Sequence, residues 1–165
     1  MRPTVRYLFL VAAGIWLAGC RQADGPVPTP NQNVQAELVD VTHDLQNIAS
    51  GRDPQAPKDL ADDLRKYARR VSAAPAVDEL SRRTAKVVVG NNLTEQTAQR
   101  LAHNLWLSIS AREMSERQTE TLQNDVQSLL MSVGVVEEQA QQVAAQVGTV
   151  QSAISDRPRR WYELF

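Results

Sequence analysis

A long stretch without proline, in which apolar residues recur at helical spacing, indicates that the second half of the chain is built from long helices. No proline stands between Pro75 and Pro158. Near the end of this stretch the steps between apolar residues alternate between four and three, as in the packed face of a coiled coil or a long helical hairpin. Valine at many of these positions favours packing within one chain, with a self-assembling coiled coil as the alternative. The residues of this apolar seam are Leu122, Val126, Leu129, Val133, Val136, Ala140, Val143, Val147, Val150 and Ile154.

Gly134 lies inside the apolar seam and predicts a turn there. Glycine is common just after the C-terminal end of a helix. We therefore expect one helix from Thr94 to about Val133 and a second one that reaches Ile154. Because glycine inside a helix costs only about 1 kcal/mol, an unbroken helix is the alternative.

The first half of the chain predicts three shorter amphipathic helices, over about residues 34–48, 57–71 and 76–87. Apolar residues recur in each at steps of three and four, which places them on one helix face. Gly51 and Gly90 follow the first and third pattern as stop signals. The apolar positions are Val34, Leu38, Val41, Leu45 and Ile48, then Leu60, Leu64, Tyr67 and Val71, then Val77, Leu80, Thr84 and Val87.

Residues 20–33 differ from the rest in composition, with prolines at alternate positions in a polar context. Such a segment is typical of an extended spacer, at about 3.1 Å per residue in a polyproline-like conformation. We expect a tether here, and a motif for a proline-binding partner is the alternative. Residues 34–156 then form one all-α domain, a bundle of four or five helices with one or two long, coiled-coil-like members. The prolines of the tether are Pro26, Pro28 and Pro30.

A short apolar segment follows two positive charges at the N-terminus. Arg2 and Arg6 precede a run that ends at Leu17, which is shorter than the roughly 20 residues that a helix needs to span a bilayer. This pattern is typical of a secretory signal peptide. The run leads into Leu17-Ala18-Gly19-Cys20, which contains the only cysteine of the chain and resembles the lipobox of bacterial lipoproteins.

The resemblance to bacterial lipoproteins implies that residues 1–19 are a signal peptide, cut between Gly19 and Cys20, and that the Cys20 sulfur carries a diacylglyceryl group. Two or more acyl chains anchor a domain to membrane lipid durably, whereas one gives only reversible binding. In the lipoproteins of enteric-type bacteria, aspartate after the cysteine retains the protein in the inner membrane. Arg21 stands at that position, which implies an outer-membrane lipoprotein facing the periplasm. An ordinary secretory signal with an incidental cysteine is the alternative.

Charge and cysteine usage argue against several classes of function. Removal of residues 1–19 takes away two of the 18 basic groups and none of the 19 acidic ones, which leaves a net charge of −3. A weak negative balance gives no electrostatic reason to bind nucleic acid. With Cys20 acylated, no thiol remains for a disulfide or a thiolate metal site. We therefore expect no nucleic-acid partner and no cofactor.

Side chains that could carry catalytic or metal chemistry are few. The chain contains no Gly-x-Ser-x-Gly, no phosphate-binding Gly-Lys-Ser/Thr loop and no His-Glu-x-x-His. Asp40, His43 and Asp44 share about one helical turn and would supply two or three ligands to a divalent ion. We interpret them as a solvated polar face, with a metal-dependent enzyme or metal sensor as the alternative. His103 stands between Leu101 and Leu105, and we expect its imidazole to be partly buried and hydrogen-bonded rather than catalytic. The sequence thus predicts that the protein is not an enzyme.

Residues 157–165 form a basic and aromatic tail after the last predicted helix. Such a tail can pack on its own bundle, on a protein partner or at a membrane interface. We expect self-docking first and partner binding second. The predicted function is that of a membrane-anchored structural or protein-interaction component, with another envelope protein as partner. The candidate partner-binding residues of the tail are Trp161, Tyr162 and Phe165.

Leu93-Thr94-Glu95-Gln96 gives the alternative function. It resembles the helix starts of small helical periplasmic stress proteins, which read Leu-Thr-x-x-Gln. Here the glutamine comes one position early, and Thr97 stands in its place, so no functional residue is transferred. The resemblance implies a client-binding chaperone or stress sensor. Thr94 as a helix N-cap accounts for the same letters.

Overall fold

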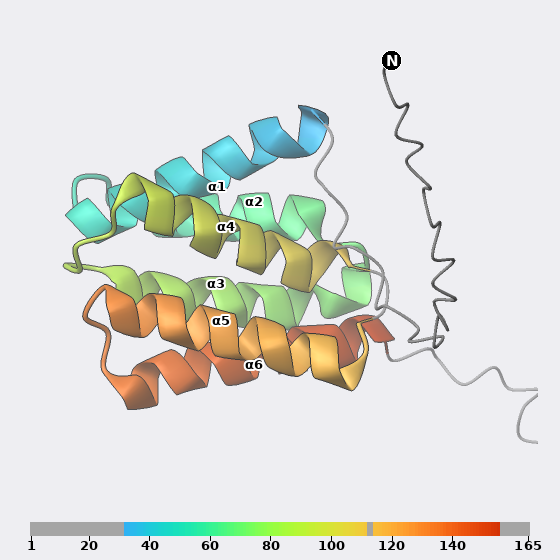
Figure 1. Cartoon of the computed structure of the whole chain (residues 1–165). Coiled ribbons are helices and arrows are strands. Elements are labelled where there is room, and N and C mark those ends of the chain that lie inside the picture. The colour runs from blue at the N-terminus through green and yellow to red at the C-terminus, as the bar shows by residue number, and fades with distance from the viewer. Residues whose placement is uncertain (1–31, 112–113, 156–165) are drawn as a thin grey trace, which may run out of the picture.

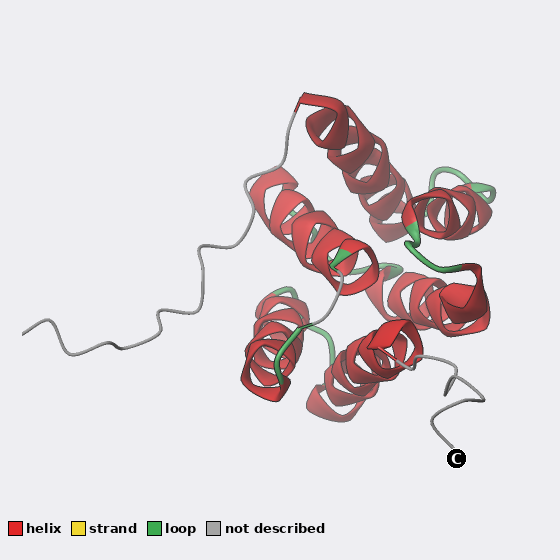
Figure 2. Cartoon of the chain, turned by 90° about the vertical axis from the view of Figure 1, so that its right-hand side faces the viewer, coloured by secondary structure: helices red, strands yellow, loops and turns green. Residues whose placement is uncertain are grey.

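The computed structural model describes residues 32–111 and 114–155. Within these ranges the chain forms α-helices and one short 3₁₀ helix, without any strand, so the predicted all-α bundle is confirmed (Figures 1 and 2). The six α-helices found there exceed the predicted four or five, because none is longer than 19 residues. They are α1 (Gln32–Ser50), α2 (Ala56–Tyr67), α3 (Ala74–Val88), α4 (Glu95–Ser110), α5 (Glu116–Ser132) and α6 (Glu137–Ser155), with η1 (Val71–Ala73) directly before α3.

Helices α3 and α4 connect two helical pairs (Figure 1). α1 packs against α2, and α5 packs against α6. α3 contacts α2 and α6, while α4 contacts α1, α5 and α6. Figure 2, which looks along the bundle, shows the helices grouped around one interior. Each helix therefore buries an apolar face against other helices, and such tertiary packing supplies most of the stability of short helices.

The chain leaves the helical conformation between Ser110 and Glu116, so the predicted single helix from Thr94 to Val133 is wrong. Ala111, which follows the last residue of α4, is extended, with φ −66° and ψ 139°. Neither glycine nor proline marks this break. The break allows α4 and α5 to pack against each other as separate helices.

A capping box starts α5 directly after the break. The Ser115 hydroxyl oxygen accepts a hydrogen bond from the Gln118 backbone N–H at 3.2 Å, and the Ser115 backbone N–H donates to Gln118 Oε1 at 2.9 Å. Two backbone groups that would otherwise lack helical partners are satisfied in this way. In α4, Thr94 is the N-cap, as predicted, and its hydroxyl oxygen accepts from the Thr97 N–H at 3.2 Å.

The predicted turn at Gly134 is confirmed. Gly134 lies between the ends of α5 and α6 and has a φ of +101°, a conformation that side chains with a Cβ rarely adopt. A Cβ at this position would also lie 3.3 Å from Asn91 Oδ1. Both observations explain why glycine stands here.

The apolar seam faces the interior along α5 and α6, but at this turn the buried position shifts by one residue. Val136, a seam position, is 64% exposed, whereas its neighbour Val135 is 6% exposed and belongs to the core. Val133 is only partly buried. A continuous heptad pattern thus spans two helices that pack on each other within one chain. The buried seam residues are Leu122, Val126, Leu129, Ala140, Val143, Val147, Val150 and Ile154.

This shift by one residue predicts different losses of stability when either of two adjacent valines is replaced by alanine. We expect Val135→Ala to lower the free energy of unfolding by about 1.5 kcal/mol, because about two buried methylene equivalents are lost. Val136→Ala removes the same atoms from an exposed position and should change stability by less than about 0.5 kcal/mol. Urea unfolding of both variants measures the difference. A larger loss in Val136→Ala would contradict the described packing of this turn.

Two buried glutamines of α6 form hydrogen bonds with backbone carbonyl groups of α3 and α4. Gln146 Nε2 donates to the backbone carbonyl of Ala76 in α3 at 3.0 Å, and Gln151 Nε2 donates to that of Ser108 in α4 at 2.5 Å. Each bond satisfies a buried amide N–H group, whereas the buried Oε1 atom of Gln151 has no hydrogen-bond partner among the described residues. These bonds specify how α6 sits against α3 and α4.

Candidate functional site

Several predicted site residues lie outside the described ranges. These are the lipid attachment and cleavage positions, Cys20 and Gly19, and the tail residues Trp161, Tyr162 and Phe165. Their roles stay predictions. The described bundle begins at Gln32, two residues before the predicted domain start, so the last two residues of the predicted tether belong to α1.

The three residues considered for metal binding differ in their exposure to solvent. Asp40 and His43 are exposed, and the Nδ1 atom of His43 lies 3.1 Å from Nδ2 of Asn47. Asp44 is only 8% exposed, so its interpretation as part of a solvated face is wrong. The reason is that α1 packs against α2 on the side that carries Asp44. In the described part of the chain, no group of three or more histidine, cysteine, aspartate or glutamate side chains could hold a metal ion.

His103 is half-buried beside an indole ring, in agreement with the predicted partly buried imidazole. Its ring stacks on that of Trp106, with 6.3 Å between the ring centroids and 22° between the planes. Burial lowers the pKa of His103. A neutral imidazole packed on an aromatic ring fits a role in packing α4.

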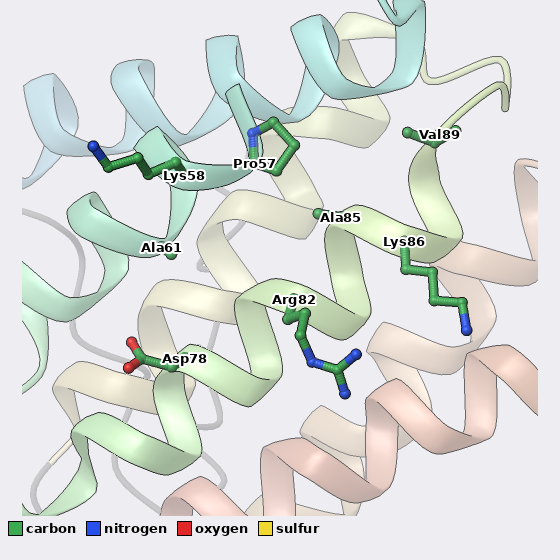
Figure 3. A pocket seen from close by; sticks show the side chains of 8 residues that line it. All are labelled: Pro57, Lys58, Ala61, Asp78, Arg82, Ala85, Lys86 and Val89. Atoms are coloured by element: carbon green, nitrogen blue, oxygen red, sulfur yellow. The ribbon is translucent and has the colours of Figure 1, made fainter. Parts of the chain in front are cut away.

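A groove between α2 and α3 is a candidate binding site among the described residues (Figure 3). Its volume is about 440 Å³. Figure 3 shows Pro57 and Ala61 on α2 opposite Ala85 on α3, with Val89 at one end. Small side chains at Ala61 and Ala85 leave this part of the helix interface open. Val89, directly after α3, is 55% exposed.

Charged side chains border this apolar centre. Lys58 extends on the α2 side, whereas Arg82 and Lys86 extend from α3 on the other (Figure 3). Arg82 pairs with Glu79 at 2.7 Å, and Asp78 pairs with Arg65 at 2.8 Å.

The ion pairs leave the rim of the groove with uncompensated positive charge. Hydrogen bonds from Arg82 and Arg83 lower the pKa of Glu79 to about 2, so this carboxylate stays ionised and committed to its arginines. Lys58 and Lys86 have no carboxylate within 4.0 Å among the described residues. Two ammonium groups on opposite sides of an apolar centre favour a ligand that is both apolar and acidic.

The α2–α3 groove was not predicted from the sequence. Its lining residues stand between the core positions of two helices, and only the helix packing brings them together. The one available signal was Val89, an apolar residue that falls outside the helical pattern just before the Gly90 stop.

A second hollow lies between α1 and α4 and has a volume of about 510 Å³. Its walls carry several amides together with His43 and Glu95. Polar groups make up a larger share of its lining than of the lining of the α2–α3 groove. The residues that line it are Gln35, Leu38, Val39, Thr42, His43, Gln46, Glu95 and Gln99.

No protein-family model, curated protein or solved structure matches the chain. Within the described ranges, no helix combines the length and the apolar character needed to cross a membrane.

Proposed function

We propose that this protein is a lipid-anchored component of a bacterial cell envelope that binds another envelope protein without catalysing a reaction. The groove between α2 and α3 takes an apolar side chain of that partner, presented on a segment that carries carboxylates. The observation that supports this assignment is the apolar centre flanked by Lys58 and Lys86.

An apolar centre with a charged rim is the arrangement expected of a surface that binds another protein. Apolar contact at the centre of an interface contributes about 25 cal/mol for each Å² removed from water. Charges at the rim add less affinity, but they steer an oppositely charged partner and suppress wrong ones. A positive rim therefore selects acidic segments.

The proposed lipid anchor and the proposed location in the cell are both inferred from the N-terminal sequence. Cys20 would carry the acyl chains, residues 20–33 would serve as the tether, and Arg21 favours the outer membrane. The helical bundle would then lie within a few nanometres of the membrane surface, since an extended tether covers about 3.1 Å per residue. This places the groove where other envelope proteins are found.

The distribution of exposed apolar residues argues against the alternative of a client-binding chaperone. Such a protein needs a contiguous apolar surface for unfolded chains. The described part of the chain exposes few large apolar residues, five in all. They are Val39, Val71, Val89, Met131 and Val136.

Site-specific cross-linking in cells tests the proposal. A photoreactive amino acid at Val89, at the end of the groove, should capture one or two proteins, and the cross-linked peptide should contain carboxylates beside an apolar residue. Ala61→Glu places a negative charge in the centre of the groove and should lower the yield by about tenfold, which corresponds to about 1.4 kcal/mol.

The matched control is Ala145→Glu, the same substitution at an exposed position of α6. It should leave the yield unchanged. Equal yields for both variants would contradict binding in the α2–α3 groove. Capture of many unrelated envelope proteins would instead support the chaperone alternative.

A further inference from the structure

Asp44 is a carboxylic acid buried within the α1–α2 interface. It lies between the core residues Val41, Leu45 and Ile48 on α1 and is more than nine-tenths buried, with 8% of its surface exposed. Its Oδ2 atom is inaccessible to solvent and has no hydrogen-bond partner among the described residues. An ionised carboxylate at such a position loses its hydration without a compensating bond.

The charged groups with the largest effects on the pKa of Asp44 are negative. Asp63 and Asp59 act from α2, Asp40 from its own helix, and Asp53 from the loop between α1 and α2. Lys66, also on α2, compensates Asp63 and lowers its pKa, which burial and Asp40 raise. Asp44 therefore faces an acidic surface without a cation of its own.

The other two helices that pack on α1 bury no charged side chain. The buried residues of α3 and α4 are apolar or carry hydroxyl groups. The hollow between α1 and α4 is lined by two ionisable residues, His43 of α1 and Glu95 of α4. Neither is among the groups with the largest effects on the pKa of Asp44.

We propose that Asp44 is a proton-binding site that controls the packing of α1 on α2. With its proton, Asp44 is a neutral group that the interface tolerates, and its hydroxyl can donate to a neighbouring carboxylate. Without the proton, a buried negative charge faces Asp59 and Asp63, and α1 packs less firmly. The proposal does not depend on the function of the groove.

The predicted pH dependence follows from the pKa of this group. Burial, followed by the four neighbouring carboxylates, raises the pKa of Asp44 to about 7 in the folded protein. In the unfolded chain the pKa of an aspartate is about 3.9. Between these values the folded state binds more protons than the unfolded state, so stability falls as pH rises from about 4 to 7. Above about pH 8 this effect is complete.

Asp44→Asn should remove that pH dependence, because the amide stays neutral and can donate to the surrounding carboxylates. Thermal unfolding of the full chain in detergent micelles measures it between pH 5 and 8.5. We expect the Tm of the variant to exceed that of the wild type by about 5 °C at pH 8 and to match it near pH 5. Asp125→Asn, at an exposed position of α5, should keep the wild-type profile.

A carbon-13 NMR titration of the Asp44 carboxyl in the wild-type protein tests the proposal even if the variant does not fold. A midpoint above pH 6 is expected, and a midpoint below pH 5 overturns the proposal. Asp63→Asn should move the midpoint to lower pH, because it removes a neighbouring negative charge. A wild-type pH slope that persists in Asp44→Asn would also overturn it.

Discussion

Replacement of Cys20 by serine should release the protein from the membrane fraction. The serine hydroxyl cannot form the thioether that holds the lipid, so the several acyl chains of the anchor would be lost together. Each buried methylene contributes about 0.8 kcal/mol to membrane binding, so we expect a nearly complete shift in fractionation. Quantification of the protein in membrane and soluble fractions measures the effect.

Mass spectrometry of the N-terminal peptide separates this result from a failure of processing. In the wild type, the peptide should begin at Cys20 and carry the mass of the acyl groups. Gln22→Ser, which introduces the same residue two positions later, should be lipidated and sediment like the wild type. An unmodified thiol at Cys20 in the wild-type protein would contradict the lipoprotein assignment.

Truncation of Leu105 should cause the second large effect, a loss of stability. Leu105 is fully buried in α4, the helix that contacts both α1 and the α5–α6 pair. Leu105→Ala leaves a cavity at that junction, and substitutions of this kind cost about 3 kcal/mol. For a domain of this size we expect the Tm to fall by about 10 °C, measured by circular dichroism during heating.

The half-buried residue Leu107, on the same helix, provides the comparison for Leu105. Leu107→Ala deletes the same atoms from a site that solvent partly reaches, so its cost should be clearly smaller. Similar losses in the two variants would show that α4 does not pack through the face that carries Leu105.

Much of the bundle could be predicted from local patterns. The stretch from Val34 to Ile48 lies within α1, and the turn at Gly134 follows from the backbone freedom of glycine. The break before Ser115 was not predicted, because its signal is a capping box inside a polar stretch without glycine or proline. Polar capping residues also occur inside helices, so the pattern of apolar residues alone did not reveal the end of α4.

The candidate sites show where local sequence patterns lose their predictive value. Asp44 stands beside core positions of α1 in the sequence, but its acidic side chain favoured exposure to solvent, and the packing of α2 buries it. The α2–α3 groove likewise exists because Ala61 and Ala85 meet across two helices. Burial and proximity of this kind depend on tertiary packing, which single-helix periodicity does not encode.

The place of α6 in the bundle determines when the domain can assemble. α6 is the last of the described helices in the chain, yet it packs against α3, α4 and α5. While it is missing, as during synthesis, the apolar faces of three helices have no cover, and the carbonyl groups of Ala76 and Ser108 lack their glutamine donors. The native interior therefore closes only once α6 has been synthesised, so the five helices before it cannot complete their packing until then.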